Sequence, residues 1–124
     1  MAWWIYKCNA KKWRGKGDWN EFDPKVNWGS TRLKTQLKDL APGDKVIAYQ
    51  TDRNELVGVT KVKEFRGPYL YLEPLEEIRA KVRPLKADPK VDAIPALTRH
   101  ARTTLFSMSA AEAQTLLRAA RRAK

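Results

Sequence analysis

The middle of the sequence, residues 45–83, constrains the fold more than any other part, because strand-like runs alternate there with turns. The runs, rich in β-branched and aromatic side chains, are residues 45–51, 56–65, 69–75 and 78–83. The polar residues 52–55 are typical of a hairpin turn, and Arg-Gly-Pro at 66–68 turns the chain again. Gly58, inside the second run, indicates either a β-bulge or the close approach of another group. Successive strands joined by short turns predict a mostly antiparallel sheet.

The flanking segments add another strand and several helices. Residues 2–8 alternate in type and carry indoles on both faces, which predicts an inner strand. Ser109 followed by Glu112 is a capping box, so we expect a C-terminal helix from there, with an apolar stripe along it. The remaining expectations are a loop at 9–23, an extended piece at 24–28, a helix at 31–40, a turn at 41–44, a short helix at 91–97 and an irregular or extended stretch at 98–107.

This order of elements predicts an α+β fold. At 124 residues the chain is long enough for one modest core, so we expect a single domain spanning 1–124. Its sheet should be curved and mostly antiparallel, with about five or six strands. Short strands in a small chain often close on themselves, so a β-barrel flanked by helices is the predicted architecture.

Composition argues against membrane, metal and catalytic functions. No apolar run approaches the roughly 20 residues of a spanning helix, and Lys7 interrupts the first one, so we expect a cytoplasmic protein without a membrane partner. The single Cys8 and single His100 are too few for a zinc site, and no cofactor is expected. Glu76 and Glu77 are adjacent on a strand and point to opposite faces, so they cannot form an acid/base pair. Because phosphate-loop, zinc-protease and serine-elbow motifs are missing too, we predict a non-catalytic protein.

Charge favours a polyanionic partner. Lys and Arg number 25 against 14 acids, a formal net charge of +11 that suits phosphate neutralisation and counterion release. All five tryptophans precede residue 29 and are interleaved with lysines and Arg14. Aromatic faces among cations suit a nucleobase attached to a phosphate chain. The alternatives are a solubilising basic surface and a core built from indoles.

Three groups of cations are candidate phosphate contacts. Ile78, Ala80 and Val82 alternate with basic residues, which predicts a half-buried strand with a row of cations on its outer face, although a solvated sheet face is the alternative. The other two groups follow the first strand and precede the C-terminal helix. The candidates are Lys11, Lys12, Arg14, Arg79, Lys81, Arg83, Arg99 and Arg102.

Several short motifs, taken in order, resemble the EVE domain, a member of the PUA-like superfamily to which YTH domains also belong. Residues 4–9, Trp-Ile-Tyr-Lys-Cys-Asn, are similar to the family's opening strand. Residues 27–31, Asn-Trp-Gly-Ser-Thr, resemble the Val-Trp-Ala/Ser-Thr segment of YTH domains. Residues 42–46 look like the Gly-Asp-x-Val turn of the EVE family, and residues 56–62 look like its Val-Gly-x-x-x-Val strand. Residues 102–117 fit the family's C-terminal segment, which ends in a capped helix. Together the motifs cover nearly the whole chain.

The resemblance implies a pocket that accepts one modified nucleobase, with methylated adenine or cytosine as the expected ligand. Trp28 would form one wall. The second cage tryptophan of YTH domains has no match, because no tryptophan follows residue 28. Either another aromatic residue would replace it, or the pocket would be more open and less selective for a methyl group. The pocket residues implied are Trp28, Lys7, Cys8, Asn9, Ser30 and Thr31, with Tyr49, Tyr69, Tyr71 or Phe106 as the opposite wall.

Three functions stay open. The first is a module that reads a modified base in DNA or RNA. The base can enter the pocket of such a module only from a single strand or after flipping out of a duplex. The second is a generic PUA-like RNA-binding module that needs no modification. The third is a binder of a free nucleoside or another small ligand, or an enzyme acting on one.

Overall fold

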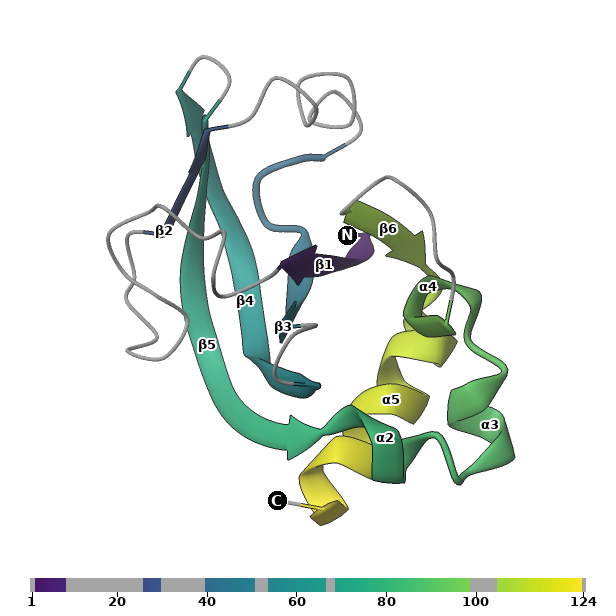
Figure 1. Ribbon diagram of the computed structural model, residues 1–124. Helices are drawn as coiled ribbons and strands as arrows, with labels where there is room; N and C mark the ends of the chain where they lie inside the picture. Colours follow the sequence, from purple (N-terminus) through teal and green to yellow (C-terminus); the bar gives the residue numbers. More distant parts are fainter. Residues whose placement is uncertain are drawn as a thin grey trace.

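A six-stranded mixed sheet forms the body of the protein, with helices gathered at one side (Figure 1). The computed structural model describes residues 2–8, 26–29, 40–50, 54–66, 69–98 and 105–123. The strands are β1 (Trp3–Cys8), β2 (Val26–Gly29), β3 (Lys45–Gln50), β4 (Glu55–Arg66), β5 (Tyr69–Lys81) and β6 (Leu105–Met108). The helices are α2 (Val82–Leu85), α3 (Pro89–Asp92), α4 (Pro95–Thr98) and α5 (Ala110–Ala123). The α+β class is confirmed, while the predicted loop at 9–23 and all but Leu40 of the predicted helix at 31–40 lie outside the described residues.

The central hairpin is confirmed, since β3 and β4 pair antiparallel. Ala48 pairs with Gly58. The next residue, Tyr49, pairs with Leu56, so Val57 is left over as the extra residue of a β-bulge. A bulge bends and twists its strand, and Gly58 therefore marks a bend in the sheet.

The prediction of two separate strands after this hairpin is wrong. β5 is one strand of 13 residues and pairs antiparallel with β4 along most of its length. Pro74 lacks a backbone N–H, and the register shifts between Val59 and Thr60, opposite this proline. The pairing of β4 with β5 thus continues on both sides of the proline. β5 stops at Lys81, because Val82 begins the unpredicted helix α2.

β1 is an inner strand, as predicted, parallel to β3 and antiparallel to β6. The sheet order is β2-β5-β4-β3-β1-β6, and β1 with β3 is its parallel ladder while the other ladders are antiparallel. The mostly antiparallel character is therefore confirmed. Across the described ranges β2 and β6 form the two edges of a curved, open sheet (Figure 1), so the predicted barrel closure is not confirmed.

Asp44 ties the turn at 41–44 to the first strand. Its buried carboxylate accepts hydrogen bonds from the backbone N–H of Ala2 (3.0 Å) and Ala41 (3.0 Å) and from the indole N–H of Trp4 (3.2 Å). Burial acts to raise the pKa of Asp44, but these hydrogen bonds outweigh it and the pKa is lowered. Gly43 adopts a φ of +95°, which favours glycine. The Gly-Asp turn therefore has a structural role.

The C-terminal helix α5 begins as the capping box predicts. The Ser109 N–H donates to the Glu112 carboxylate (2.9 Å), and the Glu112 N–H donates to the Ser109 hydroxyl (3.1 Å). The predicted stripe is buried: Ala113, Leu116, Leu117 and Ala120.

The predicted helix at 91–97 is instead two single turns, α3 and α4. Asp88 caps α3 by accepting a hydrogen bond from the Lys90 N–H (2.9 Å), and Pro89 occupies its first position. Pro95 begins α4. The prolines divide the segment, because the residue before a proline avoids helical geometry.

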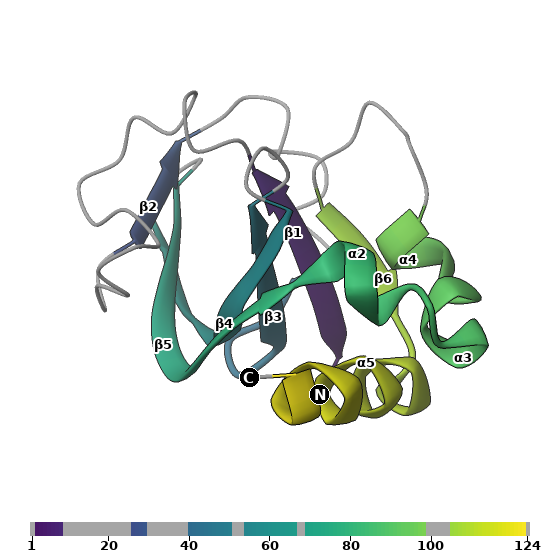
Figure 2. The same ribbon diagram turned by 60° about the horizontal axis from the view of Figure 1, so that its bottom comes forward.

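The helices cover one face of the sheet, and a hydrophobic core lies between the two layers (Figure 2). Ile5, Ile47 and Ile78 from the strands share this core with Leu116 and Leu117 from α5. Each such side chain contributes about 1.5–3 kcal/mol when fully buried. Trp3 also belongs to this core, as predicted, whereas Trp4 is only partly buried.

The other face of the sheet is buried as well. Successive residues of a strand point to opposite faces, yet residues 46–50 of β3 are all buried. Gln50 and Thr60 are fully buried polar residues, and the Thr60 hydroxyl donates to the Val46 carbonyl (2.8 Å). The central strand is thus enclosed on both sides.

Candidate nucleic-acid interface

Lys7 is the described residue of the predicted pocket with the most defined surroundings. It pairs with Tyr49 across the parallel β1–β3 ladder. Its ammonium donates to the carbonyl of Leu97 in α4 (2.9 Å) and lies 4.5 Å from the centroid of the Phe106 ring. A carbonyl and a ring face both stabilise a cation, so Lys7 links β1, β6 and α4.

The same position perturbs the charge of Lys7. Burial lowers the pKa of its ammonium, and the neighbouring charge of Lys86 lowers it further, to about 8. Lys7 is therefore mostly protonated at neutral pH and has lost about half of its charge at pH 8.

Tyr49 and Phe106, candidates for the opposite wall, both lie in the core beneath the helices and are 6% and 8% exposed. The Tyr49 hydroxyl accepts a hydrogen bond from the Asn54 side-chain amide (3.3 Å). Burial raises the pKa of Tyr49, while Asn54 and the charge of Arg83 oppose the rise. The structure thus brings Lys7, Tyr49 and Phe106 together, but leaves little ring surface of either aromatic for a base.

Trp28 lies in β2, at the other end of the sheet order, and pairs with Leu70 of β5. Leu70 pairs with Phe65 of β4, whereas Tyr49, the partner of Lys7, pairs with Leu56 at the opposite end of β4. Strand pairing among the described residues therefore does not bring Trp28 beside Lys7. Trp28 and Cys8 are described by their backbone alone, and Asn9, Ser30 and Thr31 lie outside the described residues.

Gln50 is a buried polar residue beside the predicted pocket that the sequence motifs missed. It ends β3, pairs with Cys8 at the end of β1 and is fully buried. A carboxamide both donates and accepts hydrogen bonds, but this one presents no surface to a base, and Tyr49 and Phe106 present little. The signal was present as a single polar residue closing the apolar run of residues 46–49.

The predicted row of three cations on one strand face is confirmed in part: β5 carries Arg79 and Lys81 but ends before Arg83. Arg79 has a φ of +61°, which turns the backbone within β5, and Arg83 lies in helix α2. Arg79 pairs with Glu55 (3.3 Å) and Glu77 (3.2 Å), and Lys81 pairs with Glu55 (3.8 Å). Two of the three cations are thus already neutralised by carboxylates.

The remaining predicted phosphate contacts lie outside the described residues: Lys11, Lys12, Arg14, Arg99 and Arg102. Within the described part of the chain, no cluster of three or more His, Cys, Asp or Glu side chains is arranged to hold a metal ion. None of the described helices has the length and apolarity needed to cross a membrane.

Solved structures of similar architecture come from several organisms. A protein from Rhodopseudomonas palustris is 15% identical with a TM-score of 0.76, covering 97% of this chain and 93% of that chain. Human THYN1 in complex with DNA containing 5-methylcytosine is 11% identical with a TM-score of 0.71, covering 97% and 98%. The YTH domain of the Zygosaccharomyces rouxii MRB1 protein in complex with N6-methyladenosine RNA is 14% identical with a TM-score of 0.61, covering 100% and 89%. No family model and no curated protein matches the sequence.

These likenesses show the class of fold. In particular, the chain shares its fold with the DUF55 domain of human thymocyte nuclear protein 1 and with a YTH domain. The resemblance that the sequence motifs predict is confirmed at the level of the fold.

Proposed function

We propose that this chain is a non-catalytic nucleic-acid-binding module that reads a methylated nucleobase. The observation that carries the proposal is the shared fold, over almost the whole chain, with two structures solved on methylated nucleic acids. One of those proteins is bound to DNA and the other to RNA, so the proposal covers both polymers.

Trp28 is proposed as one wall of the base pocket, because an indole face stacks on any base. A methylated base stays neutral, so cation attraction adds little and the methyl group is recognised by shape and dispersion. Polar contacts at the rim and a second aromatic wall complete the proposed site. The rim residues proposed from the sequence are Lys7, Cys8, Asn9, Ser30 and Thr31, and the second wall is Tyr69 or Tyr71, because Tyr49 and Phe106 are buried in the core.

Stacking of one base contributes about 1–3 kcal/mol, which is too little for tight binding. Phosphate contacts must supply the rest, and the net charge of +11 suits that role. Loop and C-terminal cations are the proposed contacts from the sequence: Lys11, Lys12, Arg14, Arg99 and Arg102. The base must come from a single strand or be flipped out of a duplex.

The test compares methylated and unmodified single strands of one sequence by fluorescence anisotropy. Wild type is expected to prefer the methylated strand, and Trp28→Ala to lose about 1–3 kcal/mol of binding free energy. Trp28→Phe, which keeps an aromatic face, serves as the matched control and should retain most of the preference. Equal binding of both strands by wild type, together with no effect of Trp28→Ala, would refute the proposal.

A further inference from the structure

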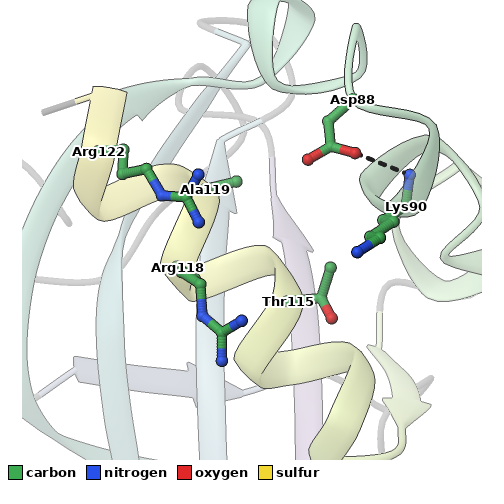
Figure 3. Close-up of a pocket in the computed structure, with 6 residues that line it drawn as sticks. All are labelled: Asp88, Lys90, Thr115, Arg118, Ala119 and Arg122. Carbon is green, nitrogen blue, oxygen red and sulfur yellow. Dashed lines mark hydrogen bonds between the residues drawn. The ribbon is translucent and has the colours of Figure 1, made fainter.

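A basic cleft lies between the segment that contains α3 and the outer face of helix α5 (Figure 3). Its volume is about 320 Å³, at the lower end of ligand pockets. Four lining residues come from α5 at helical spacings that share one face, and two come from the start of α3. The lining residues are Thr115, Arg118, Ala119, Arg122, Asp88 and Lys90.

The cations of this cleft have no carboxylate partner among the described residues. Among the described residues, the cations that form ion pairs are Lys61, Arg79, Lys81 and Arg121. The cleft residues Lys90, Arg118 and Arg122 are not among them. The contrast within α5 is direct, because Arg121 binds Glu76 through two hydrogen bonds of 3.0 and 2.7 Å. Asp88 is the single acid of the lining, and one of its oxygens accepts the Lys90 backbone N–H.

The arrangement of these cations favours an anion. Arg118 and Arg122 are four residues apart on one helix, where like charges repel by roughly 0.2–0.5 kcal/mol. The Thr115 hydroxyl already donates to the Ala111 carbonyl (2.9 Å). The donors left for an oxyanion are the two guanidinium groups and the Lys90 ammonium, and guanidinium groups match phosphate oxygens in a two-pronged fashion.

We propose that this α3–α5 cleft binds the phosphate backbone of a nucleic acid, as a contact surface separate from the base pocket. The inference rests on the proposed function for the class of polymer and is independent of base recognition. Figures 1 and 2 place β2, which carries Trp28, at the opposite end of the molecule from α3. A strand whose base enters at β2 must therefore be long enough to reach across the protein before its phosphates enter the cleft.

The experiment uses three ligands, with wild type and two charge-matched variants of the full chain. Two ligands are a methylated trinucleotide and its unmodified counterpart, both too short to span both surfaces. The third is an unmodified single strand of about 20 nucleotides, longer than the roughly 4–16 nucleotides that one small domain covers. Arg118→Gln/Arg122→Gln removes two positive charges from the cleft. Lys63→Gln/Arg121→Gln removes two from exposed positions outside its lining.

The cleft variant is expected to bind the long strand about tenfold more weakly than the control, with a salt-dependence slope smaller by about 1.4, since each phosphate contact on a single strand contributes about 0.7. Its affinity for the methylated trinucleotide should match that of the control. Equal losses in both variants would overturn the inference. So would cleft-dependent binding to anionic phospholipid vesicles without cleft-dependent binding to the long strand. Failure of the proposed function gives a different result, namely equal affinity of wild type for methylated and unmodified trinucleotides.

Discussion

Two basic regions of the molecule differ in how their charge is used. At the end of β5, Arg79 and Lys81 are paired with Glu55 and Glu77, and Glu55 is only 15% exposed. We call this group of four residues the β5 corner. In the α3–α5 cleft, the cations face solvent without a carboxylate partner among the described residues. The difference shows that the number of cations in a segment does not determine which of them are available to a polyanion.

The largest expected effect extends this comparison to Asp44, a buried carboxylate that accepts three hydrogen bonds. Asp44→Ala leaves three donors without their acceptor and should lower the free energy of unfolding by about 2–4 kcal/mol. Because folding lowers the pKa of Asp44 from 3.8, its contribution is present above pH 3.8 and is lost as the pH falls through the lower folded value. Urea unfolding as a function of pH measures both effects. Asp92→Ala, at an exposed site in α3, is the control and should change stability by less than about 0.5 kcal/mol.

The second prediction breaks the β5 corner. Glu55→Gln removes a carboxylate shared by Arg79 and Lys81, which should cost about 1–2 kcal/mol of stability because these pairs are only partly shielded from solvent. The substitution should also make the charges of Arg79 and Lys81 available to phosphates, and so strengthen binding of an unmodified strand a few-fold. Glu73→Gln makes the same charge change at an exposed pair with Lys61. It should cost less stability than Glu55→Gln and strengthen binding less. Identical behaviour of the two variants in both measurements would mean that the pairing at the corner has no special effect.

The third prediction uses the pH dependence of Lys7. Its pKa of about 8 means that its positive charge is lost as the pH rises through that value, so affinity for nucleic acid should fall a few-fold there. Lys7→Met should remove this step. Cys8, whose thiol ordinarily titrates at about 8.5, must be tested in parallel with Cys8→Ser. If the step survives in Lys7→Met and vanishes in Cys8→Ser, the lysine is not the group responsible.

The lowered pKa of Lys7 also predicts how the free energy of unfolding changes with pH. The unfolded chain holds the Lys7 proton up to pH 10.5 and the folded chain only to about 8, so the unfolded state binds more protons between these values. Stability contributed by this residue should therefore rise with pH across that window, and the rise should be missing in Lys7→Met.

The smallest effect is expected for stability in the α3–α5 cleft. Arg118→Gln/Arg122→Gln removes a repulsion between like charges and also a favourable interaction with the helix dipole, each of a few tenths of a kcal/mol. The free energy of unfolding should change by less than about 0.5 kcal/mol. A decrease of more than about 1.5 kcal/mol in the free energy of unfolding, measured in urea, would show that these arginines stabilise the fold and are not available to a ligand.

Local features of the fold could be predicted from the sequence, and features that depend on distant partners could not. The capping box at Ser109 and the β3–β4 hairpin depend on residues close in sequence, so their patterns were sufficient. The parallel pairing of β1 with β3 depends on segments about 40 residues apart. The same holds for the continuity of β5 through Pro74, because β4 supplies the ladder that carries it past the proline.

The candidate site follows the same division. Lys7 was predicted from the opening-strand motif and Tyr49 as one of four possible opposite walls, and the β1–β3 ladder pairs the two. The fully buried position of Gln50, in contrast, depends on its place at the end of an inner strand. The alternation of residues 78–83 predicted the burial of Ile78, Ala80 and Val82 correctly. It could not predict that Glu55, on another strand, would neutralise the cations between them.

The most direct test of the contrast between the two basic regions is the change in backbone amide NMR shifts when an unmodified single strand is added to the wild-type protein. We predict shift changes at Lys90, Arg118 and Arg122 that saturate together and diminish with added salt, while Glu55 and Arg79 stay unchanged. Shift changes at the β5 corner with none in the α3–α5 cleft would contradict the account.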